Sequence, residues 1–599
     1  MRKPSMVGPK TIVGQKVHEE KYRGRGESFR EFANRICTAL QDDHDHYMSL
    51  RETQLDQRYL FAGRVQAAMG SLKNVTALNC FVSATIHDSF VDGPTQEELD
   101  SLETYKHAPL SIMDTAKQAA CTMRQGGGIG FDASTLRPAG DIIRGVDAKT
   151  DGPLAFAPIL DAVCRATSSA GNRRGAMMLT MRCDHPDIEA FINAKQAVQD
   201  IPYQFRPFTG FNMSVLVTNK LMEHKASGKP FPLMFNGKIY REVDPVALWE
   251  KIMRSTYDWA EPGVIFIDRI NEMNNLHYCE TISATNPCGE QPLPPYGSCL
   301  LGSFNLVKYI SRNETFDYDK LKADIPHVVR AMDNVIDRTR YPLLEQKIEA
   351  QRKRRIGIGV TGLSNAIEFF GHPYGSEGYI QMQDEIQSFI TREVYLASTK
   401  LAKEKGPFPL FDSEKYLKSK FVETMDDEVR DHIKRYGIRN SHLTSIAPTG
   451  TISICADNIS SGIEPVLAYR QKRRIIMPEG PVTHDMYDYG FMEFGIHGKR
   501  AKNVTAKEHI SVLCTAQKHT DSAVSKTCNV PTDYSYEDFK HLYDMAFENG
   551  AKGCTTYRPN GNYPDVIEEN DIEIDREIEL NGACGWDPVT GQRIGACAD

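Results

Sequence analysis

The chain has 599 residues, 41% of them hydrophobic and 25% charged, as in a globular protein large enough for several domains or one large barrel. The formal net charge of −8 argues against non-specific nucleic-acid binding through a basic face. The sequence shows no apolar leader and no stretch near the roughly 18 apolar residues of a membrane span, so we expect a cytoplasmic protein that binds neither nucleic acid nor membrane.

Three units are expected in chain order. Residues 1–77 are charged and have a helical period from residue 28 onward, which predicts an N-terminal helical segment. Through residues 78–565, short apolar runs punctuated by glycine alternate with amphipathic stretches, a pattern typical of a mainly parallel α/β sheet with helical crossovers. Residues 566–599 begin with an acidic run, so we expect a solvated linker and a flexible tail that carries Cys584 and Cys597.

The segment between Asn286 and Cys299 is the strongest candidate site. Asn286, Cys288 and Glu290 stand at alternate positions, so an extended backbone would direct an amide, a thiol and a carboxylate the same way. Four prolines restrict the loop, and a second thiol, Cys299, follows in it. This combination favours a stiff loop built for chemistry; the alternative is a Pro-rich surface loop with an incidental cysteine.

Two glycine-bearing segments could face an anion, although an ordinary turn also explains either one. Residues 447–453 follow an apolar run and combine a glycine with three hydroxyl side chains, but they lack the Gly-Lys-Ser/Thr ending of a P-loop. Residues 124–130 contain a glycine run that lets the backbone approach a ligand, without the spacing of a dinucleotide fold. The fourteen cysteines include no Cys-x2-Cys pair, so we expect buried or redox-active thiols and no metal site.

Eight segments carry a resemblance to a known family. In chain order they are Leu78-Asn-Cys80, Gly126-Gly-Gly-Ile-Gly-Phe131, Arg173-Arg-Gly-Ala176 leading into Asp184-His-Pro-Asp-Ile188, Phe211-Asn-Met-Ser214, Asn286-Pro-Cys-Gly-Glu290, Gly297-Ser-Cys-Leu-Leu-Gly-Ser-Phe-Asn-Leu306, Pro448-Thr-Gly-Thr451 and Lys552-Gly-Cys-Thr-Thr-Tyr-Arg558. Together they resemble the catalytic subunit of ribonucleotide reductases, and most closely the dimeric, adenosylcobalamin-dependent class II enzymes. The resemblance implies a ten-stranded α/β barrel with the loop at 286–290 as a central finger.

The resemblance also implies roles for the loop residues. Cys288 would form the thiyl radical that abstracts the 3′-hydrogen of a ribonucleotide, Glu290 would act as base toward the 3′-hydroxyl, and Asn286 would hold the sugar hydroxyls. Cys80 and Cys299 would supply the reducing electrons and close into a disulfide. The residues implied for substrate binding, mainly of the phosphates, are Asn79, Gly127, Gly128, Pro448, Thr449, Gly450, Thr451 and Ile452.

The class assignment depends on motifs that are missing. Class I subunits carry an adjacent tyrosine pair where this chain offers only Tyr557, and the last residues show no glycyl-radical motif. We therefore expect a class II enzyme that uses adenosylcobalamin and reduces ribonucleoside diphosphates. The alternative is a class I catalytic subunit that needs a separate radical-generating subunit. A non-enzymatic nucleotide-binding regulator would not need the thiols at 80, 288 and 299.

The same resemblance implies partners and regulation. We expect a homodimer whose interface binds a deoxynucleoside triphosphate effector through loops near 145–152 and 168–174, the second containing Asn172, Arg173 and Arg174. No full ATP cone fits before Asn79, so we expect specificity control without an overall dATP switch. Cys584 and Cys597 are candidates for a tail pair recharged by thioredoxin or glutaredoxin, although twelve intervening residues exceed the spacing usual in the family.

Overall fold

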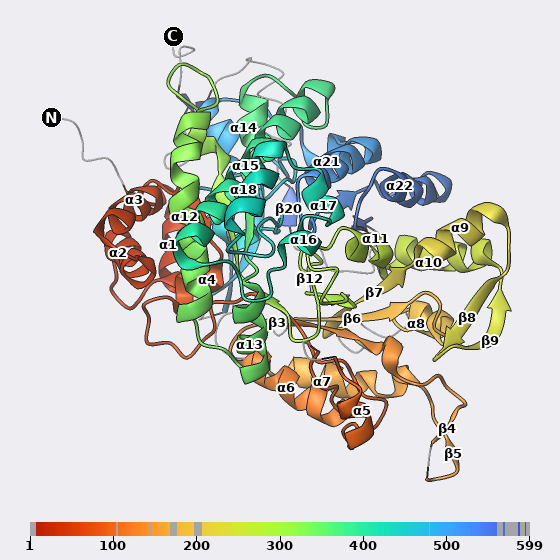
Figure 1. The fold of residues 1–599 in the computed structure, drawn as a ribbon. Helices are drawn as coiled ribbons and strands as arrows, with labels where there is room; N and C mark the ends of the chain where they lie inside the picture. The colour runs from red at the N-terminus through yellow and green to blue at the C-terminus, as the bar shows by residue number, and fades with distance from the viewer. Residues whose placement is uncertain are drawn as a thin grey trace.

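A computed structural model describes most of the chain (Figure 1). The described residues are 7–103, 106–143, 145–167, 176–196, 207–477 and 480–559, with short strands at 567–569, 585–586 and 593–594. The predicted effector residues Asn172, Arg173 and Arg174 lie outside the described residues, as do the tail cysteines Cys584 and Cys597.

The centre of the fold is a ring of strands in two halves. Five parallel strands form the first half in the order β2 (Cys80–Val82), β3 (Gly128–Asp132), β6 (Met177–Arg182), β7 (Phe211–Val217) and β10 (Gly263–Phe266). The second half contains β19 (Gly553–Tyr557), β18 (Thr527–Asn529) extended backward by 523–525, the extended residues 444–446, β15 (Gly357–Thr361), and β14 (Leu301–Asn305) extended backward by β13 (Ser298–Cys299). The neighbours within this half also run parallel.

Two antiparallel junctions close the ring. β10 pairs with β19 at one side, and β2 pairs with β13 at the other. Single bridges, Ile358 to Thr444 and Ile446 to Val524, complete the second half. The predicted ten-stranded α/β barrel is therefore confirmed, with its two five-stranded halves running in opposite directions. β14 and β15 are buried along their whole length, as strands covered on both faces are.

Helices surround the barrel in Figure 1. The N-terminal segment forms α1 (Ile12–Tyr22), α2 (Phe29–Leu40), α3 (His44–Leu55) and α4 (Gly63–Ala68). The later helices are α5 (Gln96–Asp100), α6 (Ile112–Arg124), α7 (Ala157–Thr167), α8 (Ile188–Asn193), α9 (Asn219–Ser227), α10 (Pro245–Trp259), α11 (Ile267–Glu272), α12 (Tyr318–Arg338), α13 (Leu344–Lys353), α14 (Leu363–Phe369), α15 (Glu377–Lys405), α16 (Ser413–Tyr416), α17 (Lys420–Glu423), α18 (Asp427–Tyr436), α19 (Gly450–Ile454), α20 (Tyr489–Phe494), α21 (Ala506–Lys518) and α22 (Tyr536–Glu548). Among the described helices, none has both the length and the apolar character needed to cross a bilayer.

Two terminal features differ from the sequence expectations. The N-terminal segment is not purely helical, because β1 (Tyr59–Phe61) pairs antiparallel with β14 and so joins the barrel sheet. Part of the expected acidic linker is also a strand, since β20 (Ile567–Glu569) pairs with β16 (Arg470–Met477), which forms a hairpin with β17 (Gly480–Tyr487). In this pairing the backbone of residues 567–569 runs antiparallel to residues 471–473.

The described residues also form smaller hairpins, each a separate two-stranded sheet. They are β4 (Ile142–Ile143) with β5 (Ala148–Lys149), β8 (Phe231–Phe235) with β9 (Lys238–Val243), β21 (Gly585–Trp586) with β22 (Arg593–Ile594), and β11 (Ala284–Thr285) with β12 (Pro292–Leu293). The last of these belongs to the barrel interior, since its residues pack in a small apolar cluster with strand residues. The members of this cluster are Ala62, Cys80, Val82, Ala284, Leu293, Cys299, Leu301 and Ala447.

Candidate active site

The expected finger is a hairpin whose tip carries the amide, the thiol and the carboxylate. β11 and β12 pair antiparallel and leave 286–291 as the connecting turn. The backbone N–H of Asn286 donates to Gln291 O at 3.2 Å, and Asn286 Oδ1 accepts from the Gln291 N–H at 2.9 Å. Gly289 donates its N–H to Asn286 O at 3.0 Å and has a φ of 80°, which favours glycine. The side-chain oxygen of Asn286 is thus occupied by the turn, which leaves its Nδ2 to face a ligand.

Both halves of the barrel hold the fingertip. Asn212, on β7 of the first half, donates from Nδ2 to Pro287 O at 3.0 Å. Ser445 Oγ and the Ala523 N–H, from the second half, each donate to Glu290 O at 3.0 Å. The backbone on either side of Cys288 is therefore fixed by hydrogen bonds from opposite walls of the barrel.

Glycines of β3 allow this close approach. A Cβ added at Gly130 would stand 1.9 Å from Thr285 O of the finger, and one at Gly128 would stand 3.2 Å from the Pro287 ring. Real Cβ atoms essentially never come within 3.0 Å of another heavy atom, so Gly130 cannot carry a side chain while the finger keeps its place. The glycine run that suggested close approach to a ligand is first of all the place where the finger packs against the wall.

The three finger residues differ sharply in exposure. Cys288 is exposed, whereas Asn286 and Glu290 are 3% and 2% exposed. A buried carboxylate ordinarily has to be hydrogen-bonded or near a counter-charge, or else its protonated form is favoured. The arrangement presents a thiol at an open tip above a carboxylate and an amide that are shielded from bulk water.

The two remaining predicted thiols meet directly beneath the finger. Cys80 and Cys299 are directly opposed on the antiparallel strands β2 and β13. Opposed residues of such strands have Cα atoms about 4.5–5.5 Å apart, within the range of roughly 4.4–6.8 Å that disulfides span. Cys80 Sγ also donates to Glu290 Oε1 at 3.8 Å, and burial raises the pKa of the Cys299 thiol far above its usual range. The structure thus brings together residues that are far apart in sequence.

The predicted phosphate segment forms the turn into α19. Pro448 is exposed, Gly450 and Thr451 are half-buried, and Thr449 and Ile452 are buried. Thr449 has a positive φ of 51° and directs its hydroxyl inward, where it contacts Thr361 Oγ1 at 3.0 Å and accepts from the Gly462 N–H at 2.7 Å. The Thr449 side chain therefore shapes the turn, and the groups left to meet an anion are the N–H groups that open α19.

Asn79 lies beside the glycine run, since its backbone oxygen accepts from the Gly128 N–H at 3.0 Å. Asn79 is half-buried, and its Oδ1 is buried without a hydrogen-bond partner among the described residues. Such an atom is an acceptor that a bound ligand or water could satisfy. A Cβ at Gly127 would meet the Phe81 ring at 2.5 Å, so this glycine has a packing role of its own.

Sequence reasoning did not single out the residues that hold the finger. Asn212 stands on a strand that is otherwise buried, and a polar residue in an apolar run was the available signal. Ser445 lies in a short apolar run as well, yet nothing local distinguishes its role from that of a satisfied core serine. Their importance depends on contacts with a loop more than 70 residues away in sequence.

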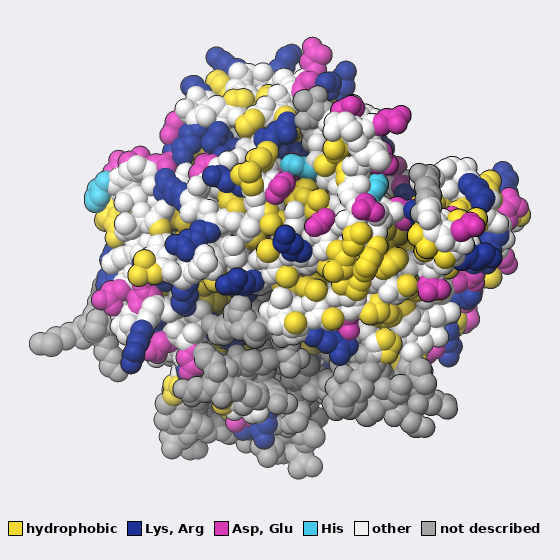
Figure 2. Space-filling view, turned by 90° about the horizontal axis from the view of Figure 1, so that it is seen from below, with side chains coloured by type: hydrophobic (Ala, Val, Ile, Leu, Met, Phe, Trp, Pro, Cys, Tyr) yellow, Lys and Arg dark blue, Asp and Glu magenta, His cyan; other side chains and the backbone are white. Residues whose placement is uncertain are grey.

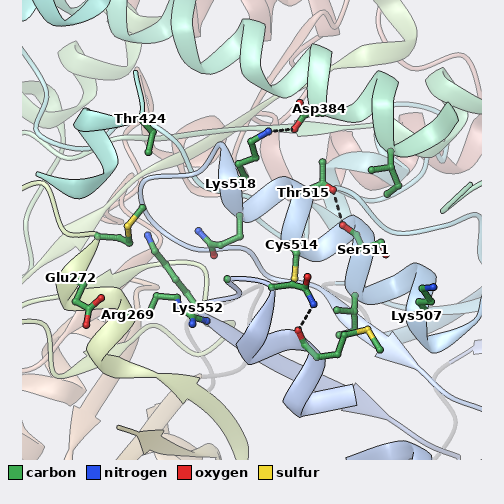
Figure 3. Close-up of a pocket in the computed structure, with 17 residues that line it drawn as sticks. Arg269, Glu272, Asp384, Thr424, Lys507, Ser511, Cys514, Thr515, Lys518 and Lys552 are labelled. Carbon is green, nitrogen blue, oxygen red and sulfur yellow. Dashed lines mark hydrogen bonds and ion pairs between the residues drawn. The ribbon is translucent and has the colours of Figure 1, made fainter. Parts of the chain in front are cut away.

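A separate cavity of about 710 Å³ lies outside the barrel between α11, α15, α21 and α22 (Figure 3). None of the predicted site residues lines it. Two of its lysines are already engaged: Lys518 pairs with Asp384 at 2.9 Å, and Lys552 Nζ donates to the backbone oxygens of Asp521 and Ser522 at 2.6 Å. The cavity therefore carries no argument for the chemistry of the finger.

Known proteins share this barrel. The family described as "Ribonucleotide reductase, barrel domain" matches residues 101–488 and 496–557. The vitamin B12-dependent ribonucleoside-diphosphate reductase of Thermoplasma acidophilum is 32% identical over 498 residues, which cover 78% of this chain and 62% of that protein. The protein of the same name from Mycobacterium tuberculosis (strain CDC 1551) is 32% identical over 507 residues, covering 79% and 70%. The ribonucleoside-diphosphate reductase subunit alpha of Chlamydia pneumoniae is 27% identical over 493 residues, covering 71% and 47%. The chain thus spans less than two thirds of the length of the first of these relatives.

Proposed function

The chain belongs to the ribonucleotide reductases, and we propose that it is a class II enzyme that reduces ribonucleoside diphosphates to 2′-deoxyribonucleoside diphosphates by thiyl-radical chemistry. One observation carries the proposal: an exposed thiol, Cys288, stands at a rigid fingertip above Glu290, which in turn contacts one of two directly opposed thiols. A radical hydrogen-atom carrier, a base and a two-electron reductant are the three functions that the reaction needs.

Each residue of the site has its own role in the reaction. Cys288 takes the 3′-hydrogen atom of the ribose and returns it at the end. Glu290 takes the 3′-hydroxyl proton, which helps the 2′-hydroxyl leave as water, and Asn286 Nδ2 donates to a sugar hydroxyl. Cys80 and Cys299 together give up two electrons and two protons and become joined by a disulfide, so that the 2′-carbon gains hydrogen and one water is formed.

Fixed geometry is the protein's main contribution to the rate. Reacting atoms must be held about 3–3.5 Å apart in alignment, and small displacements are costly. The backbone on both sides of Cys288 is pinned by Asn212, Ser445 and Ala523. Burial of Glu290 and Asn286 keeps bulk water away from the sugar, which protects a radical intermediate from side reactions.

The residues at the tip fit adenosylcobalamin. When bound, this cofactor supplies the radical that removes the hydrogen atom of the Cys288 thiol. Cys288 is exposed, and a Cβ added at Gly289 would meet no heavy atom within 4 Å, so a bulky group can approach the thiol directly. The Cys288–Gly289 tip is the part of the chain that would face the cofactor, and the names of the Thermoplasma and Mycobacterium relatives include vitamin B12 dependence.

A class I subunit is the less favoured alternative. Its radical would arrive through adjacent tyrosines, whereas β19 carries Thr555 and Thr556 before Tyr557. Thr555 is exposed and Thr556 is buried, hydrogen-bonded to Tyr543 at 2.9 Å, so neither offers an oxidisable ring. The relatives with the higher identities carry the B12-dependent name, while the Chlamydia alpha subunit stands at 27%.

A homodimer is part of the proposal. Figure 2 views the side of the molecule that carries α5, α6 and α7 and shows a group of hydrophobic side chains on this face. The exposed large hydrophobic residues of this part of the chain are Phe90 (47%), Val91 (59%), Met113 (41%), Ile142 (62%) and Val146 (68%). Exposed apolar residues on one face favour a protein partner. A second copy would place the expected deoxynucleoside triphosphate site, near residues 145–152, at the interface.

A thiol reductant completes the cycle. Cys80 and Cys299 must be re-reduced after each turnover, by thioredoxin or glutaredoxin through the tail cysteines Cys584 and Cys597. None of the twelve described cysteines is joined in a disulfide, so the structure corresponds to the reduced state from which a turnover starts.

Anaerobic turnover tests the proposal. The purified chain, given adenosylcobalamin, dithiothreitol and each ribonucleoside diphosphate in turn, is expected to form deoxynucleotide without any second subunit. The Cys288→Ser variant is expected to form none, while the matched surface variant Cys121→Ser should retain activity, because Cys121 is exposed on α6 away from the finger. Absence of product from the intact chain would reject the class II assignment.

A further inference from the structure

The two thiols of the Cys80–Cys299 pair stand in different electrostatic surroundings. Cys80 Sγ donates to the Glu290 carboxylate at 3.8 Å, so a negative charge on this sulfur would face a carboxylate. Cys299, on the next strand, lies on the side of the β14–β15 pair. Both side chains are almost fully buried, at 2% and 0% exposure, so accessibility does not distinguish them.

Arg355 is the cation on the Cys299 side. β14 pairs with β15 from Leu301 opposite Gly357, and Cys299 and Arg355 each stand two residues before that pair on their own segments. The Gly357 N–H donates to Leu300 O at 2.9 Å, which holds this part of the register. Because side chains alternate along an extended backbone, Arg355 shares its face with Gly357, where an added Cβ would lie 2.8 Å from Gln291 Nε2 at the base of the finger.

Arg355 is held in place by a buried cluster of charges. The guanidinium is ion-paired with Glu280, and Lys353 Nζ lies 2.9 Å from the other oxygen of that carboxylate. Lys353 also pairs with Glu349, so that two cations and two anions balance. The four side chains are buried or nearly so, and charges are retained at such depth only when paired. The cluster therefore fixes the position of the Arg355 guanidinium.

The charges around Cys299 act on the pKa of its thiol in both directions. Burial raises the pKa of the Cys299 thiol, and the charge that most strongly opposes this rise is Arg355. The carboxylates of Asp521 and Glu290 act in the other direction. The Asp521 carboxylate accepts hydrogen bonds from the Leu443 N–H at 2.7 Å, the Thr444 N–H at 3.0 Å and Tyr395 Oη at 2.8 Å.

We propose that Arg355 is a positioning residue that makes the Cys80–Cys299 disulfide open in one direction, with Cys80 as the sulfur attacked and Cys299 as the sulfur that leaves. The inference rests on the proposed function, which makes this disulfide at every turnover. A thiolate of a dithiol reductant attacks Cys80 Sγ and forms a mixed disulfide there. The Cys80–Cys299 bond breaks, and its electron pair stays on Cys299 as a thiolate beside Arg355.

The remaining steps return both thiols. Cys299 takes a proton from water, and the second thiol of the reductant attacks its own sulfur in the mixed disulfide, releasing Cys80. The reductant leaves as a disulfide, so two electrons pass from it to the cysteine pair. The direction matters because a thiolate that is better stabilised leaves faster in thiol–disulfide exchange.

A trapping experiment tests the direction without turnover. The full chain is oxidised with diamide, the Cys80–Cys299 disulfide is verified by peptide mapping, and the protein is exposed briefly to 2-mercaptoethanol. Acid quenching, alkylation of free thiols and mass spectrometry then locate the adduct. We expect the adduct on Cys80 and the alkyl group on Cys299 in at least a tenfold excess. Adducts on Cys299, or equal adducts on both, would overturn the inference and leave the proposed function intact.

Variants of Arg355 test the cause. Arg355→Met should reduce the excess of Cys80 adduct over Cys299 adduct to less than threefold and should slow reduction of the disulfide about tenfold. In Arg355→Lys both the adduct ratio and the rate of disulfide reduction should stay within threefold of the parent values. A merely structural role predicts equal loss in both variants, so equal loss would overturn the inference, as would an unchanged Arg355→Met. Failure of diamide to form the Cys80–Cys299 disulfide at all would instead count against the shared geometry and the proposed function.

Discussion

The contact between the barrel wall and the finger can be tested by adding a single methyl group. In Gly130→Ala the new Cβ would stand 1.9 Å from Thr285 O, where real Cβ atoms keep at least 3.0 Å. The backbone oxygen cannot rotate away, so the stem of the finger or β3 must move by 3.0 − 1.9, about 1.1 Å. Overpacking of this kind costs about 1–3 kcal/mol of stability.

The effect on catalysis should exceed the effect on folding. A misplacement of about 1 Å at reacting groups can lower a rate about 100-fold. We expect Gly130→Ala to fold, to unfold a few degrees earlier in a thermal melt, and to lose about 100-fold in kcat in the anaerobic assay. Gly128→Ala is the matched control, because its Cβ would lie 3.2 Å from the Pro287 ring and needs a shift of only a few tenths of an ångström. Its kcat should fall less than tenfold. A fully active Gly130→Ala protein would refute the account of how the finger is positioned.

Three further outcomes are expected. Ser445→Ala removes one of the two donors to Glu290 O, so kcat should fall about threefold to tenfold, in line with a hydrogen bond worth about 1 kcal/mol. An unchanged kcat would mean that the Ala523 N–H alone fixes this carbonyl. Cys80→Ser and Cys299→Ser should each abolish multiple turnover with dithiothreitol, whereas Cys183→Ser should not, because Cys183 is a buried thiol far from the finger in the sequence. Sustained turnover of either Cys80→Ser or Cys299→Ser would show that this cysteine does not belong to the reductant pair. Burial raises the pKa of Glu368 from 4.5 to about 7, so the folded state binds this proton more tightly than the unfolded state, and the stability from this group is present below pH 4.5 and is lost as the pH rises toward 7. The melting temperature of Glu368→Gln relative to that of the parent should therefore rise between pH 5 and pH 8, and the reverse trend would contradict the pKa shift.

The sequence allows the candidate active-site residues to be named but not placed. Cys288, Glu290 and Asn286 stand in one short segment whose pattern is local. Alternating apolar runs and helices indicate a parallel α/β sheet, while the barrel is implied by the family resemblance. Cys80 and Cys299 are 219 positions apart, and only the strand register shows that they face each other. Ring closure could not be read from the sequence either, since it depends on single bridges at Thr444 and Ile446 that are too short to leave a periodic pattern.

The tertiary fold also changed the meaning of two motifs. The glycine run at 124–130 predicts a place where the backbone approaches a ligand, and in the structure Gly128 and Gly130 of this run meet the finger. Thr449 was expected to offer its hydroxyl to an anion, yet a positive φ directs that hydroxyl into a buried network with Thr361 and Gly462. In both motifs the residue types were correctly noticed, while the partner was supplied by a distant part of the chain.

A single-turnover experiment without reductant tests the central claim most directly. Pre-reduced protein is mixed anaerobically with adenosylcobalamin and one ribonucleoside diphosphate, and both the deoxynucleotide and the cysteine state are measured. The account predicts close to one deoxynucleotide per active chain, an equal amount of Cys80–Cys299 disulfide, and neither in Cys288→Ser. Deoxynucleotide formed while Cys80 and Cys299 remain reduced, or formed by Cys288→Ser, would contradict it.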